Sequence, residues 1–188
     1  GLGNAINPLT SLNFPFRIPT MLIVTWRGGP GFADEPQHEL MGPITPDMLD
    51  IIRVAHRLFP TSDNEISGAL KAAEEEMRRT DLPFAFIMEK GSVRDEGIDA
   101  PPPRTLRPGK AKNFRDGTAP PARLPALERL VEELPVMAAV IATTGYCGRE
   151  LFTIADRKQY FYQVGSMGCA AGMGLGIALN VTRPVVVL

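Results

Sequence analysis

The sequence predicts an α/β fold in which parallel sheets carry helices on both faces. Short, continuously apolar runs recur along the chain, and stretches with the helical spacing of apolar residues separate them. Strands of a parallel sheet are covered on both faces, so they are apolar throughout rather than alternately apolar and polar. A Pro-rich stretch without regular pattern also divides the chain, which predicts parts of two such units joined by a linker.

The expected division is a first unit at residues 1–95, a linker at 96–122 and a second unit at 123–188. In the first unit we expect, in chain order, a strand at 20–26, helices at 45–59 and 62–79, and a strand at 83–88. Thr45 and Pro46 suit the N-cap and the first position of the earlier helix. Ser62 and Glu65 form a capping box for the later one.

Beyond the linker, helices and strands are expected to alternate. Leu127, Leu130 and Val131 lie on one face of a predicted helix. The remaining elements expected are a strand at 136–142, a short helix at 148–156, a strand at 160–164, a helix at 167–179 and a strand at 184–188. Each strand should therefore lead into a helix that packs on the sheet.

The composition is that of an ordinary globular protein, with 44% apolar and 22% charged residues in a chain of 188. The formal net charge of −1 offers no electrostatic attraction for nucleic acid or an anionic membrane. Cys147 and Cys169 are too few for a disulfide framework, and the opening residues lack the pattern of a secretory signal, so we expect a cytoplasmic protein. The chain starts without Met and ends in an apolar run, and we expect it to be a piece of a longer protein.

Two glycine-containing turns are the strongest candidates for a binding site. They read "ATTGYCG" at 142–148 and "VGSMG" at 164–168, and each follows a predicted strand. At the carboxyl ends of parallel strands, free backbone N–H groups and helix dipoles favour an anion, and Thr143, Thr144 and Ser166 add hydroxyl donors. If the two strands are neighbours, both turns could meet one phosphate or diphosphate. Glycine content alone favours ordinary tight turns equally well.

A membrane helix is the alternative interpretation of the glycine-rich stretch 164–179. This stretch has about sixteen residues, fewer than the roughly 20 needed to span a bilayer, and strand patterns flank it. Gly168, Gly172 and Gly176 are spaced by four residues, which predicts close packing of a helix on its sheet or on a partner subunit.

Four stretches together resemble a known enzyme family. They read "GLGNAINPLTSL", "WRGGPGFADEPQH", "ATTGYCGRELF" and "QVGSMG", and they occur in the order found in the phosphonopyruvate decarboxylases, which are thiamine diphosphate-dependent 2-oxo acid decarboxylases. The resemblance implies the later part of a pyrimidine-binding domain followed by the early part of a diphosphate-binding domain. It further implies thiamine diphosphate and Mg²⁺ as cofactors, a small 2-oxo acid as substrate and a homo-oligomer with a shared active site.

The resemblance also implies roles for individual residues. The implied cofactor-binding residues are Thr143, Thr144, Gly145, Gly165, Ser166, Met167 and Gly168. In this set, Gly165 would offer its carbonyl to the aminopyrimidine, and Met167 would support the bent conformation of the cofactor.

On the substrate side, the resemblance implies that His38 lies near the substrate, where it is the side chain best suited to donate a proton, because an imidazole titrates near neutral pH. The residues alone favour a solvated surface histidine in an acidic loop. Asn4 and Gln37 are implied to lie near the substrate. The guanidinium fork of Arg27 suits phosphonate oxygens, although a charge at a strand end is an equally good interpretation.

Two features of the family are not found in the sequence. Its Gly-Asp-Gly metal motif is expected after Leu188, and the glutamate that activates the cofactor is expected before Gly1. We therefore expect no metal ligand in these 188 residues and no activity from them alone. Two alternatives stay open, namely a sulfopyruvate decarboxylase and a non-catalytic module that binds a nucleotide or coenzyme.

Overall fold

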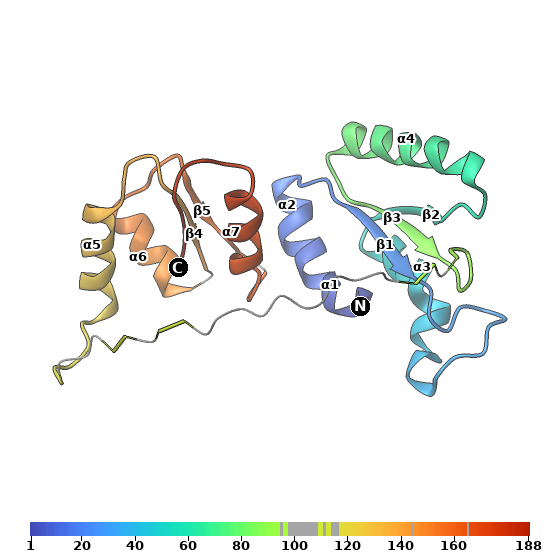
Figure 1. Ribbon diagram of the computed structural model, residues 1–188, viewed down its shortest axis with the longest axis horizontal. Coiled ribbons are helices and arrows are strands. Elements are labelled where there is room, and N and C mark those ends of the chain that lie inside the picture. Colours follow the sequence, from blue (N-terminus) through green and yellow to red (C-terminus); the bar gives the residue numbers. More distant parts are fainter. Residues whose placement is uncertain (95, 98–108, 111, 114–116, 144, 165) are drawn as a thin grey trace.

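The computed structural model describes residues 1–94, 96–97, 109–110, 112–113, 117–143, 145–164 and 166–188. Within them the chain forms two three-stranded sheets, and every strand pairing is parallel. Helices pack on both faces of the sheets (Figure 1). The predicted α/β class is therefore confirmed. Much of the expected linker falls outside the described residues, so the domain boundaries stay a prediction.

The first sheet has the strand order β1-β3-β2. Its elements in chain order are β1 (Met21–Thr25), α3 (Met41–Ile51), β2 (Ala55–Leu58), α4 (Asp63–Thr80) and β3 (Phe84–Met88). Phe84 and Phe86 of the central strand pack towards α4, whereas Ala85 and Ile87 pack towards α3. In the edge strand β1, Ile23 is 57% exposed, so the expectation of a fully buried strand is wrong there.

The helix expected at 45–59 is wrong at both ends. The helix α3 begins at Met41, and the Thr45 hydroxyl donates to the Met41 carbonyl (2.6 Å) instead of capping. It ends before Arg53, whose left-handed backbone (φ 57°) turns the chain. Residues 55–58 then form an edge strand, so the order is strand, helix, strand, helix, strand.

Pro46 lies inside α3 rather than at its first position. A proline has no N–H for the carbonyl four residues earlier, which here belongs to Gly42. The indole N–H of Trp26 donates to that carbonyl instead (2.7 Å). The segment that follows β1 is thereby tied to α3, which fixes the start of the loop between them.

The second sheet has the order β5-β4-β6. Its elements in chain order are α5 (Arg123–Glu133), β4 (Ala139–Ala142), α6 (Tyr146–Ile154), β5 (Tyr160–Tyr162), α7 (Ala170–Ala178) and β6 (Val185–Val187). Val131 of α5 and Leu151 of α6 pack with Val140 and Ala142 of the central strand. All of the elements predicted for this part are confirmed, with bounds that differ by a few residues.

Residues 2–16 form a helical segment that the sequence pattern does not predict. It comprises α1 (Leu2–Pro8), a π-helical stretch (Leu9–Asn13) and α2 (Phe14–Phe16). In Figure 1 it lies between the two sheets, and the ring of Phe16 is 5.0 Å from that of Phe161 in β5. This segment thus contacts the second sheet at its far end, while Leu2 packs into the core of the first.

The glycine that packs α7 onto its sheet is Gly174. A Cβ atom there would lie 2.3 Å from Cγ2 of Val187 in β6, whereas at Gly172 or Gly176 it would meet no atom within 4 Å. Of the two contacts expected from the four-residue glycine spacing, the one with the sheet is therefore wrong, because Gly174 makes it, and the one with a partner subunit stays a prediction. Among the described residues, no helix combines the length and apolarity required to cross a bilayer.

Two alanine substitutions in α7 should therefore act in opposite directions. Gly176→Ala should raise the free energy of unfolding by up to about 1 kcal/mol, because alanine favours the helix and the site is open. Gly174→Ala should lower it by about 1–3 kcal/mol, because the added methyl overpacks against a stiff valine. Urea unfolding of the complete protein measures both values, and equal effects would contradict the packing described.

Candidate functional site

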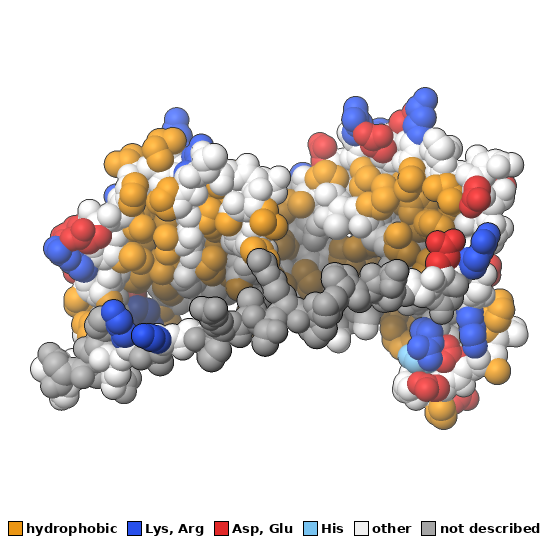
Figure 2. Space-filling model, viewed as in Figure 1, with side chains coloured by type: hydrophobic (Ala, Val, Ile, Leu, Met, Phe, Trp, Pro, Cys, Tyr) orange, Lys and Arg blue, Asp and Glu red, His pale blue; other side chains and the backbone are white. Residues whose placement is uncertain are grey.

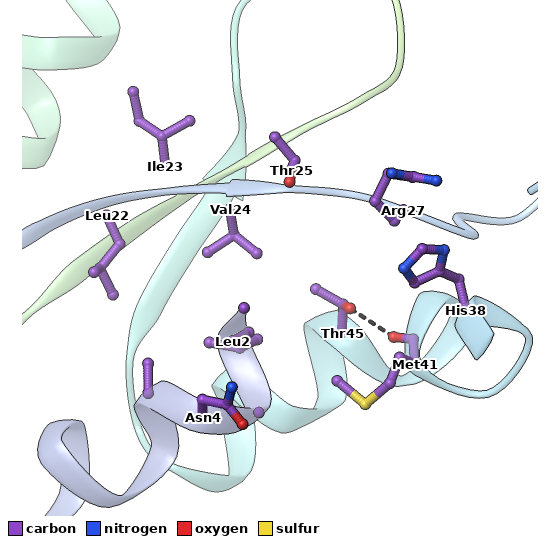
Figure 3. Close-up of a pocket in the computed structure, with 13 residues that line it drawn as sticks. Leu2, Asn4, Leu22, Ile23, Val24, Thr25, Arg27, His38, Met41 and Thr45 are labelled. Carbon is purple, nitrogen blue, oxygen red and sulfur yellow. Dashed lines mark hydrogen bonds between the residues drawn. The ribbon is translucent and has the colours of Figure 1, made fainter. Parts of the chain in front are cut away.

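A first pocket lies at the carboxyl end of β1. Its volume is about 560 Å³, and α1, β1, the 3₁₀ turn η2 (Pro36–His38) and the start of α3 line it. Three of the predicted residues, Asn4, Arg27 and His38, meet in its lining. Figure 3 shows the His38 ring pointing from η2 into the space between β1 and α3, next to Arg27. Sequence segments more than thirty residues apart therefore form one cavity.

The Asp34 carboxylate organises the loop beside this pocket. It accepts hydrogen bonds from Nε (2.9 Å) and Nη2 (2.7 Å) of Arg27 and from the backbone N–H groups of Gly28 (2.7 Å) and Glu35 (2.8 Å). It also lies 3.2 Å from Nδ1 of His38. These contacts, led by the bond from Arg27, hold the pKa of Asp34 far below its usual range. The carboxyl is therefore ionised at any physiological pH.

Two glycines allow the loop to close against α3. Gly28 has a left-handed backbone (φ 67°), and a Cβ there would lie 2.4 Å from the His38 carbonyl oxygen. A Cβ at Gly42 would lie 1.7 Å from the carbonyl oxygen of Gly28. Because backbone meets backbone at both points, a larger residue at either position would displace the turn that carries His38.

Gln37 and Arg27 are predicted to contact the substrate, but both side chains are bonded to acidic residues of the loop. The Gln37 side-chain amide donates to Glu35, and Gln37 is not part of the pocket lining. Arg27 lines the pocket, but its Nε and Nη2 atoms already bind Asp34. An incoming phosphonate would therefore meet Nη1 of Arg27 unless it displaced Asp34.

The two glycine turns lie side by side at the carboxyl edge of the second sheet. The strands that precede them, β4 and β5, are paired neighbours, as the diphosphate prediction requires. A small cavity of about 210 Å³ is lined by Thr143 together with Ser166, Met167 and Gly168. An adjoining cavity of about 530 Å³ also includes Thr143 and adds Gly145. The predicted Thr144 and Gly165 lie outside the described residues.

The small cavity contains donors suited to an anion. Ser166 is 3% exposed, and its hydroxyl oxygen has no hydrogen-bond partner among the described residues. A buried hydroxyl without a partner is costly, which marks this one as a candidate ligand contact. Thr143 offers its hydroxyl, because its backbone N–H already donates to Leu188 (2.7 Å). Met167, at 82% exposed, covers little of the cavity by itself.

Sequence reasoning missed Gln163, which holds the second turn in place. Its side chain is 2% exposed and donates from Nε2 to the Ser166 carbonyl oxygen (2.7 Å). The same carbonyl accepts the backbone N–H of Cys169 (3.2 Å), so the turn is held from two sides at the start of α7. The available signal was a polar residue between a buried strand and a glycine turn.

Comparison with known proteins identifies the relatives of this chain. No protein-family model matches it. It is 48% identical over 190 residues to the phosphonopyruvate decarboxylase of Streptomyces viridochromogenes, and 47% identical to that of Streptomyces hygroscopicus. Both alignments cover the whole chain and 48% and 47% of the two relatives. The chain is a homologue of the phosphonopyruvate decarboxylases. The resemblance indicated by the four sequence stretches is thereby confirmed.

A sulfopyruvate decarboxylase from Methanosarcina acetivorans is more distant. It is 30% identical over 197 residues, and the alignment covers 99% of the chain and 49% of that relative. The chain thus spans about half the length of the curated relatives it matches. The described residues contain no group of three or more His, Cys, Asp or Glu side chains placed to hold a metal ion.

Proposed function

We propose that the protein containing this chain decarboxylates phosphonopyruvate to phosphonoacetaldehyde and carbon dioxide. The single observation behind this choice is the identity of 48% and 47% to phosphonopyruvate decarboxylases, against 30% to the sulfopyruvate enzyme, each over essentially the whole chain. The paired turns at β4 and β5 support the same choice, because they offer an anion site at the sheet edge where α/β proteins bind cofactors.

Thiamine diphosphate is the proposed cofactor. When bound, it supplies a nucleophilic carbon and an electron sink for the decarboxylation. The hydroxyls of Thr143 and Ser166 and the backbone at Gly145 and Gly168 would hold its diphosphate, and the exposed Met167 would then be covered by it. Thr144 and Gly165 belong to the same proposal. The Mg²⁺ ligands are expected in the protein beyond Leu188.

The first pocket is the proposed substrate side. His38 would deliver a proton to the carbon from which carbon dioxide has left, and Asn4 and Arg27 would contact the substrate from opposite walls. Gln37 would act only if the loop rearranged, since it is bonded to Glu35. The walls from α1 and β1 are largely apolar, which keeps water from competing for that proton.

The remaining parts of the proposal concern organisation. Residues 1–95 would belong to the pyrimidine-binding domain and 123–188 to the diphosphate-binding domain, with 96–122 as linker. A homo-oligomer would place a complete site between copies. Hydrophobic side chains gather on the visible face over both parts of the described chain (Figure 2). Ile23, Leu175 and Leu179 are each more than half exposed, which favours such contacts. We propose a cytoplasmic location.

Release of carbon dioxide from phosphonopyruvate and from sulfopyruvate by the complete protein tests the proposed substrate. We expect kcat/KM to favour phosphonopyruvate by about a hundredfold or more, because the two substrates differ in anion charge and shape. A preference for sulfopyruvate would overturn the substrate assignment. Tight cofactor binding without turnover of either compound would instead favour a non-catalytic binding module.

His38→Gln should lower kcat by about tenfold or more, because a general acid contributes roughly 10²–10⁴ in rate. His56→Gln is the matched control, since His56 lies on β2 with its ring against the Val54 carbonyl and away from the pocket lining. Steady-state kinetics of both variants measure the difference. Unchanged turnover in His38→Gln would remove its proposed role.

Ser166→Ala should separate cofactor binding from stability. The loss of one hydroxyl contact should weaken thiamine diphosphate binding about fivefold to a hundredfold. The stability of the cofactor-free protein should stay equal or rise, because a buried hydroxyl without a partner is removed. Calorimetry with Mg²⁺ and thermal unfolding measure the two effects, with Ser67→Ala on the exposed side of α4 as control. Unchanged affinity would contradict the proposed diphosphate contact.

A further inference from the structure

We propose that Asp34 is a positioning residue for His38, which it holds with the ring hydrogen on Nδ1 and with Nε2 facing the first pocket as the proton-carrying atom. This inference rests on the proposed function of His38. It adds to that function a named atom, a fixed tautomer and a second residue on which proton delivery depends.

The contact geometry determines which ring nitrogen carries the hydrogen. Nδ1 of His38 lies 3.2 Å from Oδ1 of Asp34. Asp34 already accepts four N–H groups, which a carboxylate does and a carboxylic acid does poorly. Because an ionised carboxylate can only accept, Nδ1 has to donate. Nε2 is then the nitrogen that gains and loses a proton, and in Figure 3 it points into the cavity.

The ring is restrained on both sides of this contact. The side chain of Asp34 is 10% exposed and that of His38 is 25% exposed, so both are partly covered by the loop. The backbone of His38 is fixed by the close approach of Gly28, and His38 ends the 3₁₀ turn η2, which begins two residues after Asp34. Asp34 is held by its other hydrogen bonds and would not follow a rotation of the imidazole, so such a rotation would break the contact.

The charge of Asp34 is compensated by Arg27, so Asp34 mainly positions the imidazole. Arg27 neutralises Asp34, and Glu35 lies 3.7 Å from Nη2 of Arg27. The pocket residues from α1, β1 and α3 have uncharged side chains. They include Leu2, Asn4, Leu22, Val24, Met41 and Thr45. No other charged side chain in the described part of the chain lines this pocket. Asp34 is therefore the charged group that sets the tautomer of His38.

The proton step balances in this arrangement. Protonated His38 gives the hydrogen on Nε2 to the substrate carbon, whose electron pair forms the new C–H bond. The neutral ring that remains keeps its hydrogen on Nδ1, still donated to Asp34. Solvent then returns a proton to Nε2. No rotation of the ring and no change at Asp34 are needed between turnovers.

Nitrogen NMR of the histidine rings in the complete protein tests the tautomer directly. At a pH where the ring is neutral, the His38 signals, assigned by their loss in His38→Gln, should show hydrogen on Nδ1. In Asp34→Asn, part of the population should shift to hydrogen on Nε2, because a side-chain amide can donate to Nδ1. The His56 signals should stay unchanged. Wild-type His38 with its hydrogen on Nε2 would overturn the proposal without any variant.

Kinetics separates positioning from a merely structural role of Asp34. Asp34→Asn should lower kcat about tenfold to a hundredfold with little change in KM, and should alter the limb of the pH profile that depends on His38. Added to His38→Gln, it should cost little more, because both act through one ring. The proposal would be overturned if the effects of the two substitutions on kcat were additive. It would also be overturned if Asp34→Asn changed KM as strongly as kcat.

The proposal and the proposed function can fail independently. Absence of decarboxylation with the predicted NMR tautomer would refute the function and leave the Asp34 contact intact. Decarboxylation with an unaltered tautomer in Asp34→Asn would refute the positioning role alone. If Asp34→Asn does not fold, Asp34→Glu keeps the charge and moves the acceptor, so it should disturb the tautomer while retaining the Arg27 ion pair.

Discussion

The loop that follows β1 depends on one carboxylate, that of Asp34. Between Trp26 and the start of α3 there is little regular structure and much glycine and proline, so packing alone would not specify a conformation. Asp34 replaces packing with hydrogen bonds to Arg27, two backbone amides and His38. The contact of Gly28 with Gly42 then fixes the loop against α3. The position of His38 in the pocket follows from these contacts.

The second turn shows the same division between close packing and polar fixation. Gly174 brings α7 onto the sheet and does not line the cavity. Gly168 lines the cavity, and a Cβ atom added there would meet no atom within 4 Å. Gln163 holds the carbonyl of Ser166, a residue that lines the cavity and whose buried hydroxyl has no partner among the described residues. Neighbouring glycines in one stretch therefore serve different purposes, and their spacing alone does not assign them.

Sequence patterns predicted the buried elements well and the edges poorly. Residues 83–88 are apolar throughout because they form a central strand, and that pattern is unmistakable. Residues 55–58 form an edge strand that includes His56 and Arg57, so they lack the continuous apolar run of a buried strand. The sequence pattern therefore predicted that the preceding helix extends through them. The first helical segment was not predicted, because Pro8 and Pro15 are residues that disfavour a helix. In the structure a π-helical stretch lies between them. Asp34 looked like a solvated loop residue, because its partners are set by chain closure rather than by periodicity.

Charge balance limits what the first pocket can do for a dianionic substrate. Arg27 and Asp34 form a neutral pair, so together they attract an anion less than a lone arginine would. Beside the first glycine turn, Arg149 of α6 lines the larger cavity, and its guanidinium lies 5.8 Å from the Tyr146 ring centroid, so it is a cation available near the proposed diphosphate. A phosphonate carries more negative charge than a sulfonate. Discrimination between them therefore depends on how much cationic charge the site adds to this neutral pair.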